Sequence, residues 1–258
     1  MIGIIGFGRF GRLTAKNLSR DFEVIVYNRK DKAQEIIDCG ARACDLATTC
    51  NQKIIIICVP ISIMQNTLKM IGPMLQPDAL VVDVCSVKVY PAQWMNKLLP
   101  DTVSILATHP MFGPDSAADT LSGSKIVLCR ERIKVQLYKR IKNWLSAQGL
   151  IIIETTPADH DRQIATTLSL THFIGRALAE FGARETKIDT EGYKRLLHIL
   201  GVVQHDTWQL FVDMHNYNPY AKKKRLEFIN AMVKLNDLLD QQYEKNKPEI
   251  KLDKDKIQ

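Results

Sequence analysis

Short apolar runs alternate with stretches of helical periodicity along the first 156 residues. The runs are rich in Ile and Val, have the length of strands, and cover residues 2–7, 22–27, 53–60, 79–84, 103–108, 124–129 and 150–155. Strands this apolar are typical of a parallel sheet that helices cover on both faces. The pattern therefore predicts an α/β fold, with a doubly wound, Rossmann-type domain over residues 1–156.

Beyond Pro157 the pattern becomes helical. No comparable strand run follows, and apolar residues recur at spacings of three and four, for example at Leu196, Leu200 and Val203. We expect an all-α C-terminal domain over residues 157–245, followed by a charged, frayed tail over residues 246–258.

Composition narrows the class of protein. The 258 residues are 46% hydrophobic and 24% charged, and the apolar runs are far shorter than the ~20 residues that cross a bilayer, so no membrane span is expected. The net charge of +7 is dispersed except at residues 222–225, a run that we interpret as a solvated helix face rather than a nucleic-acid site. The strand pattern begins at Met1, which leaves no room for a targeting segment, and we expect a cytoplasmic protein.

The six cysteines lack the C-x-x-C spacing of zinc sites, and several lie inside apolar runs. We interpret them as small buried side chains and expect neither a metal site nor a disulfide framework.

The segment GFGRFG, residues 6–11, follows the first strand pattern directly and opens a helical pattern. This context predicts a dinucleotide site: Gly6 allows a tight turn, Gly8 lets the backbone approach a pyrophosphate, and Gly11 lets the helix pack on the strand. The free N–H groups at the helix start would face the anion.

The end of the second strand pattern bears on which dinucleotide binds. An NAD site usually has Asp or Glu here, whereas this chain has Asn28, followed by Arg29 and Lys30, whose charges attract a 2′-phosphate. We predict NADP as the cofactor, with Arg29 as the main contact. Asp31 either caps the next helix or binds the ribose of NAD, so NAD stays an alternative cofactor. The candidate cofactor-binding residues are Gly6, Gly8, Arg9, Phe10, Gly11, Asn28, Arg29, Lys30, Val59 and Pro60.

The stretch THPMFGP, residues 108–114, follows an apolar run. Proline cannot continue a central strand and restricts the residue before it, so we expect His109 where a strand stops and a rigid loop begins. Two further stretches stand out, VDVCSVK at residues 82–88 and ADHDRQIATTLSLTHFIGRAL at residues 158–178. Together with the glycine motif, their order and spacing resemble the prephenate and arogenate dehydrogenases of tyrosine biosynthesis over about residues 1–240, most closely the compact plant-like arogenate enzymes.

The resemblance implies an oxidative decarboxylation, in which hydride leaves ring carbon C4 for the nicotinamide, the carboxylate departs as carbon dioxide, and the ring becomes aromatic. His109 matches the catalytic histidine, and a neutral imidazole is suited to accept the C4 hydroxyl proton. Ser86 matches the hydroxyl partner that would join this histidine and the substrate hydroxyl in one hydrogen-bonded line. The alternatives are a loop histidine bonded to backbone, a helix N-cap for Ser86, and a surface helix start for Lys88.

The resemblance also implies substrate-binding residues in the helical domain. His172 matches a second histidine of the family, or is a core histidine, while the pair His160 and Asp161 reads as mainly structural. Asp206 aligns with the acidic position associated with arogenate preference, because a carboxylate would bind the arogenate ammonium, or else it is a helix N-cap. The arginine segment that binds substrate carboxylates in the bacterial family members is absent here. We expect Arg176 to take this role, with Lys194 and Arg195 behind it, or each of the three to be a surface charge.

The family further implies a homodimer formed through the helical domains. Two other functions stay open at this point. One is a β-hydroxyacid or imine reductase, although no lysine of the kind those enzymes use stands near LTHFIGRA. The other is a non-catalytic NADP sensor, which would have no need of Ser86 and His109.

Overall fold

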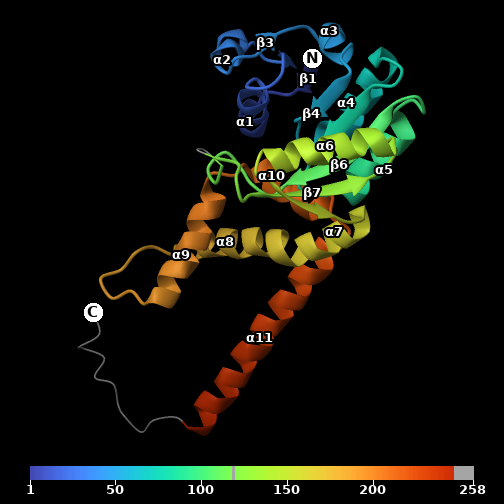
Figure 1. Ribbon diagram of the computed structural model, residues 1–258. Coiled ribbons are helices and arrows are strands. Elements are labelled where there is room, and N and C mark those ends of the chain that lie inside the picture. The colour runs from blue at the N-terminus through green and yellow to red at the C-terminus, as the bar shows by residue number, and fades with distance from the viewer. Residues whose placement is uncertain (118–119, 247–258) are drawn as a thin grey trace.

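The computed structural model describes residues 1–117 and 120–246, and an eight-stranded sheet runs through its N-terminal part (Figure 1). The strand order is β3-β2-β1-β4-β5-β6-β7-β8. The strands are β1 (Ile2–Ile5), β2 (Val24–Tyr27), β3 (Arg42–Ala43), β4 (Ile54–Ile57), β5 (Leu80–Asp83), β6 (Ser104–Pro110), β7 (Lys125–Arg130) and β8 (Ile151–Glu154). The predicted α/β class is confirmed.

The sheet is not parallel throughout. Neighbouring strands from β3 to β6 pair in parallel, but β7 runs antiparallel to β6, with His109 opposite Val127, and β8 is parallel to β7. The expectation of a parallel sheet is therefore wrong at this edge. A parallel pair needs a long crossover, usually a helix, and the described residues between β6 and β7 form turns and coil without a helix.

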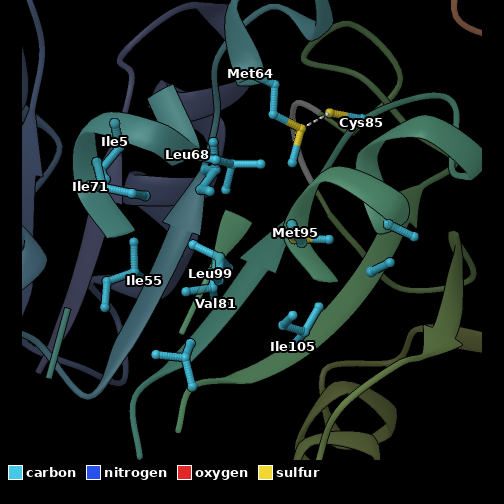
Figure 2. Packing of buried hydrophobic residues seen from close by; sticks show 14 of the residues in the cluster. Ile5, Ile55, Met64, Leu68, Ile71, Val81, Cys85, Met95, Leu99 and Ile105 are labelled. Carbon is cyan, nitrogen blue, oxygen red and sulfur yellow. Dashed lines mark hydrogen bonds between the residues drawn. The ribbon is translucent and has the colours of Figure 1, made fainter. Parts of the chain in front are cut away.

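Helices cover both faces of the sheet. They are α1 (Arg9–Leu18), α2 (Ala33–Asp38), α3 (Leu46–Cys50), α4 (Ile61–Ile71), the 3-10 turn η1 (Gly72–Met74), α5 (Val89–Leu98) and α6 (Val135–Ala147). On one face, Met64 and Leu68 of α4 and Met95 of α5 pack on strand residues such as Val81 and Ile105 (Figure 2). On the other face, an apolar cavity of about 570 Å³ remains between α1, α6 and the sheet.

The C-terminal part is helical, with no strand among residues 157–246. Its helices are α7 (Pro157–Ile164), the π-helical turn η2 (Ala165–Ser169), α8 (Leu170–Phe181), α9 (Glu191–Gln204), α10 (Trp208–Asn216) and α11 (Ala221–Lys245). Helix α9 packs on α8, while α11 projects away from the body of the molecule (Figure 1). No helix in the described part of the chain is both long and apolar enough to span a membrane. Apart from Asn246, the predicted tail lies outside the described residues.

Candidate active site

Four of the candidate residues come from one edge of the sheet. Because β1, β4, β5 and β6 are parallel, their carboxyl ends meet at the same edge, which is where open α/β sheets bind ligands. Gly6 follows β1, Val59 follows β4, Ser86 follows β5, and His109 is the penultimate residue of β6. The sheet topology thus brings the glycine motif and the THPMFGP motif to the same side of the molecule.

The glycine turn has the geometry of a phosphate cradle. Gly6 has a φ of +101°, and a Cβ atom there would lie 2.3 Å from the carbonyl oxygen of Cys58. A Cβ atom at Gly11 would lie 2.2 Å from the carbonyl oxygen of Gly6, whereas one at Gly8 would meet nothing within 4 Å. Helix α1 begins without a side-chain cap. The turn therefore leaves space beside Gly8 and N–H groups at the helix start, which fits the pyrophosphate of a dinucleotide.

A pocket of about 270 Å³ lies at the end of β2, where the ribose of a dinucleotide would be expected; Asn28, Lys30 and Asp31 are among its lining residues. The Asn28 amide holds the local backbone: its Oδ1 accepts from the N–H of Phe7 at 3.0 Å, and its Nδ2 donates to the carbonyl of Lys30 at 2.8 Å. Asp31 Oδ1 accepts from the N–H of Ala33 at 3.0 Å, at the first residue of α2. Arg29 is exposed next to this pocket.

Arg9 and Pro60 lie where the nucleotide end meets the helical part. The Arg9 guanidinium donates to the carbonyl of His205 at 3.0 Å and pairs with Asp115. Pro60 is the N-cap residue of α4, and the N–H of Ser62, the second residue of this helix, donates to Asp213 of α10 at 3.0 Å. The candidate cofactor residues are thus connected to the linker between α9 and α10 and to α10 itself.

A buried ion pair underlies the VDVCSVK motif. Lys88 and Asp83 are both fully buried, and the Lys88 ammonium donates to the Asp83 carboxylate and to the carbonyl of Thr108. Asp83 Oδ1 also accepts from the N–H of Thr108 at 3.1 Å, and its Oδ2 accepts from the N–H of Cys85 at 3.0 Å. The alternative reading of Lys88 is correct about the helix start, since Lys88 is the N-cap residue of α5, but wrong about the surface, since the side chain is fully buried. The network ties the loop after β5 to β6 next to His109.

Ser86 lies in that loop. Its expected alternative role as a helix N-cap is wrong, since α5 begins at Val89 with Lys88 as the N-cap residue. Its Oγ is buried and has no hydrogen-bond partner among the described residues. Ser86 and His109 form no direct hydrogen bond in the described part of the chain. The predicted line includes the substrate hydroxyl and stays a prediction. A buried hydroxyl without a partner is costly in a folded protein unless a ligand or water satisfies it.

His109 lies inside β6, not in a loop after it, since the strand continues to Pro110, which is opposite Ile126. The side chain is buried, and its Nδ1 lies 2.9 Å from Nε2 of His160. The alternative of a loop histidine bonded to backbone is therefore wrong. Burial lowers the pKa of His109 well below its usual range, and the charges of His160 and Lys88 act in the same direction. The neutral imidazole is thus the stable form of this side chain.

The partner of His109 comes from α7. His160 is buried, and its Nδ1 lies 2.7 Å from Oδ1 of Asp161. The Asp161 carboxylate also accepts the N–H groups of Lys88 and Val89, at 2.7 and 2.9 Å, and so caps the start of α5. The HD pair therefore contacts the histidine of the THPMFGP motif directly, which sequence reasoning missed.

His172, Asp206 and Arg176 form one cluster. His172 Nε2 lies 3.7 Å from Oδ2 of Asp206, and Arg176 donates to the carbonyl of Asp206 at 2.5 Å. The N-cap of α10 is Thr207, whose side chain accepts from the N–H of Leu210, so the alternative of Asp206 as the cap is wrong. Arg176 is half-buried, with its guanidinium near the rings of Trp208 and Phe211, and is not a free surface charge.

This cluster has unmet hydrogen-bonding capacity. His172 Nδ1 and Arg176 Nε are buried without a hydrogen-bond partner in residues 1–117 and 120–246. Burial lowers the pKa of His172, the Asp206 charge opposes this shift, and the Arg176 charge adds to it. A carboxylate, a guanidinium and a neutral imidazole in one place suit a small ligand that carries both an ammonium and a carboxylate.

Within the described residues, no group of three or more His, Cys, Asp or Glu side chains is arranged to hold a metal ion. The polar side chains of the site are instead arranged as hydrogen-bonding pairs and ion pairs, which bind and orient organic groups.

Comparison with known proteins agrees with this arrangement. Residues 16–154, more than half of the chain, match the model of the prephenate dehydrogenase nucleotide-binding domain. The chain is 33% identical to arogenate dehydrogenase 2, chloroplastic, of Arabidopsis thaliana, covering 95% of this chain and 72% of that protein. The chain belongs to the prephenate dehydrogenase family. Because its relatives are prephenate and arogenate dehydrogenases, the protein is an NAD(P)-dependent oxidoreductase.

Other comparisons extend over both parts of this prephenate dehydrogenase family member. Residues 177–250 match a TYRAAT1-like C-terminal domain model. The structure of Synechocystis arogenate dehydrogenase superposes with a TM-score of 0.70 at 25% identity, covering 93% of this chain and 92% of that one. A prephenate dehydrogenase from A. aeolicus, in complex with hydroxyphenyl propionate and NAD+, shares the fold with a TM-score of 0.75 at 19% identity, over 93% of this chain and 91% of that one. The helical part thus belongs to the same family fold as the nucleotide-binding part.

Proposed function

We propose that this enzyme oxidises arogenate to tyrosine with NADP as the preferred acceptor, and that it also converts prephenate to 4-hydroxyphenylpyruvate. The observation that carries the proposal is His109, a buried, neutral imidazole at the edge of the sheet that also holds the glycine turn. The arogenate dehydrogenase names of the plant and Synechocystis relatives support the substrate class.

In this proposal the C4 hydride and its electron pair pass to the nicotinamide of bound NADP, which is the chemistry that the cofactor supplies. The carboxylate leaves as carbon dioxide, and its bonding electrons enter the ring and make it aromatic. Nε2 of His109 accepts the proton of the C4 hydroxyl as the carbonyl develops, and returns it to the oxygen of the new phenol. Ser86, with its unpartnered Oγ, orients the hydroxyl, and Arg176 binds a substrate carboxylate.

The test is to mix the purified protein with arogenate or prephenate, each with NADP or NAD, and to follow absorbance of the reduced cofactor. We expect the highest kcat/KM with arogenate and NADP. Absence of turnover with both substrates would remove the proposal. A preference for prephenate or for NAD would support the dehydrogenase reaction but contradict the proposed preference for arogenate or for NADP.

Cofactor preference is expected to depend on Arg29, which is exposed beside the pocket at the end of β2. Arg29→Ala should raise the KM for NADP about 10- to 100-fold with little change for NAD, because one charge-assisted hydrogen bond to a 2′-phosphate contributes roughly 1.5–3 kcal/mol. Steady-state kinetics with both cofactors measure the ratio. Arg20→Ala, at another exposed arginine, is the matched control. An unchanged ratio in Arg29→Ala would exclude this residue as the selector.

Substrate preference is expected to depend on Asp206, whose carboxylate is free of the capping role. Asp206→Asn should lower kcat/KM for arogenate relative to prephenate by about 10- to 100-fold, because the ammonium of arogenate loses a charged partner. Competition between the two substrates measures the ratio. Asp237→Asn, at an exposed carboxylate of α11, should leave it unchanged. Equal losses for both substrates would show that Asp206 only supports His172.

We also propose that two copies associate through their helical parts, and that the chain divides at residues 156 and 245 as the sequence predicts. Helix α11 exposes large apolar side chains along its length, including Leu235 at 61% and Leu239 at 70%, and exposed apolar patches are typical of protein interfaces. Light scattering should give twice the chain mass of 29.3 kDa. Leu235→Asp with Leu239→Asp should give the monomer, and Asn236→Asp on the same helix should not. A wild-type monomer at micromolar concentration would contradict the dimer.

The location of the protein in the cell is a further proposal. We propose a cytoplasmic location, whereas the plant relatives are named chloroplastic. A fluorescent fusion observed in the native cell would decide between the two.

A further inference from the structure

Three buried side chains form a continuous chain of hydrogen bonds behind the site. Oδ1 of Asp161 lies 2.7 Å from Nδ1 of His160, and Nε2 of His160 lies 2.9 Å from Nδ1 of His109. The two imidazole rings are nearly perpendicular, at 74°. The exposed fractions of His109, His160 and Asp161 are 6%, 3% and 0%. These three side chains are therefore shielded from bulk water, and the protons of their hydrogen bonds have few alternative partners.

Asp161 sets the direction of this chain. Its Oδ1 accepts from the N–H of Lys88 and its Oδ2 from the N–H of Val89, while its backbone carbonyl accepts from Nδ2 of Asn218 at 2.8 Å. A carboxylate held by two N–H donors acts as an acceptor. The hydrogen bond to His160 therefore requires a proton on Nδ1 of His160.

The remaining protons follow from this one. Burial lowers the pKa values of both histidines, so both rings are neutral and each carries one ring proton. With its proton on Nδ1, His160 presents the lone pair of Nε2, and His109 must donate from Nδ1. The lone pair of His109 is then on Nε2. No hydrogen bond among the described residues engages that atom.

We propose that His160 is a positioning residue that holds His109 in the tautomer whose Nε2 accepts the hydroxyl proton. The proposal deepens the proposed function and rests on it. The proton leaves the substrate oxygen, whose electron pair stays behind, and forms a bond to Nε2 of His109. The cation formed keeps its Nδ1–H bond to the His160 lone pair, and the Asp161 carboxylate behind it stabilises the positive charge.

The direct test observes the protons. In protein labelled with nitrogen-15 histidine, the chemical shifts should show a protonated Nδ1 and an unprotonated Nε2 for His109 in the dinucleotide-bound enzyme. The opposite tautomer would overturn the proposal. This measurement needs no substrate turnover, so its failure is distinct from failure of the proposed dehydrogenase reaction.

Variants of His160 test the consequence. His160→Phe removes the acceptor, and we expect kcat to fall about 10- to 100-fold, the loss known for metal-binding histidines that lose their hydrogen-bond partner, with little change in the KM for the cofactor. His160→Gln can place its Oε1 where Nε2 stood, and should restore both the tautomer and most of kcat. His198→Phe, at an exposed histidine of α9, is the matched control.

A His160→Phe enzyme that folds, keeps the tautomer and keeps wild-type kcat would overturn the proposal. If His160→Phe does not fold, the wild-type shifts and His160→Gln decide the question. A folded His160→Gln enzyme with the opposite tautomer would also count against it.

Discussion

Replacing His109 by alanine is expected to lower kcat by about 10²- to 10⁴-fold, the contribution usual for a positioned general base. The dissociation constant for NADP should change little, because the glycine turn and the pocket at the end of β2 do not contain this side chain. Single-turnover kinetics and fluorescence titration with the cofactor measure the two quantities.

The control for this variant is His198→Ala, which removes an exposed histidine and should leave kcat unchanged. A large loss of cofactor affinity in His109→Ala, with kcat retained, would assign His109 a structural role. In the wild type, kcat/KM should stay constant as the pH is lowered to values well below the ordinary histidine pKa of ~6.5. It should fall only as the pH decreases through the lowered pKa of His109, where the imidazole gains a proton and no longer accepts one.

The second large effect concerns stability. Lys88→Met is expected to lower the free energy of unfolding by about 3–5 kcal/mol, because it leaves the fully buried Asp83 carboxylate without its cation. The carbonyl of Thr108, one residue before His109, loses a donor as well. Urea denaturation followed by circular dichroism measures the change.

Lys97 provides the matched control, because it is an exposed lysine of α5, the helix that Lys88 precedes. Lys97→Met should stay within about 0.5 kcal/mol of the wild type, as is usual for surface substitutions. An equally small loss in Lys88→Met would mean that water or structural relaxation satisfies Asp83.

Hydrophobic patterning located the seven longer strands to within a few residues, because period and length are properties of local sequence. It missed β3, which has two residues, and the antiparallel direction of β7, which depends on how the chain returns after Pro110. The exposed apolar residues of α11 are a further case, since periodicity predicts an apolar helix face but not which surface packs on it.

At the site, the sequence indicated residue types and left their partners open. Motif spacing indicated His109, Ser86 and Asp206, whose roles stay predictions until tested. The contact of His160 with His109 joins residues 51 positions apart, and that of Asp213 with Ser62 spans 151 positions. Such pairs form only when segments far apart in the sequence pack together, so no local pattern in one sequence could have placed them.

Two carboxylates of the helical part cap helices of the other part: Asp161 accepts the first N–H groups of α5, and Asp213 accepts from Ser62 at the start of α4. During synthesis on the ribosome, residues 1–156 emerge before either carboxylate exists. The nascent sheet unit therefore lacks two caps, each typically contributing about 1 kcal/mol. It should reach its full resistance to proteases only after Asp213 has left the exit tunnel.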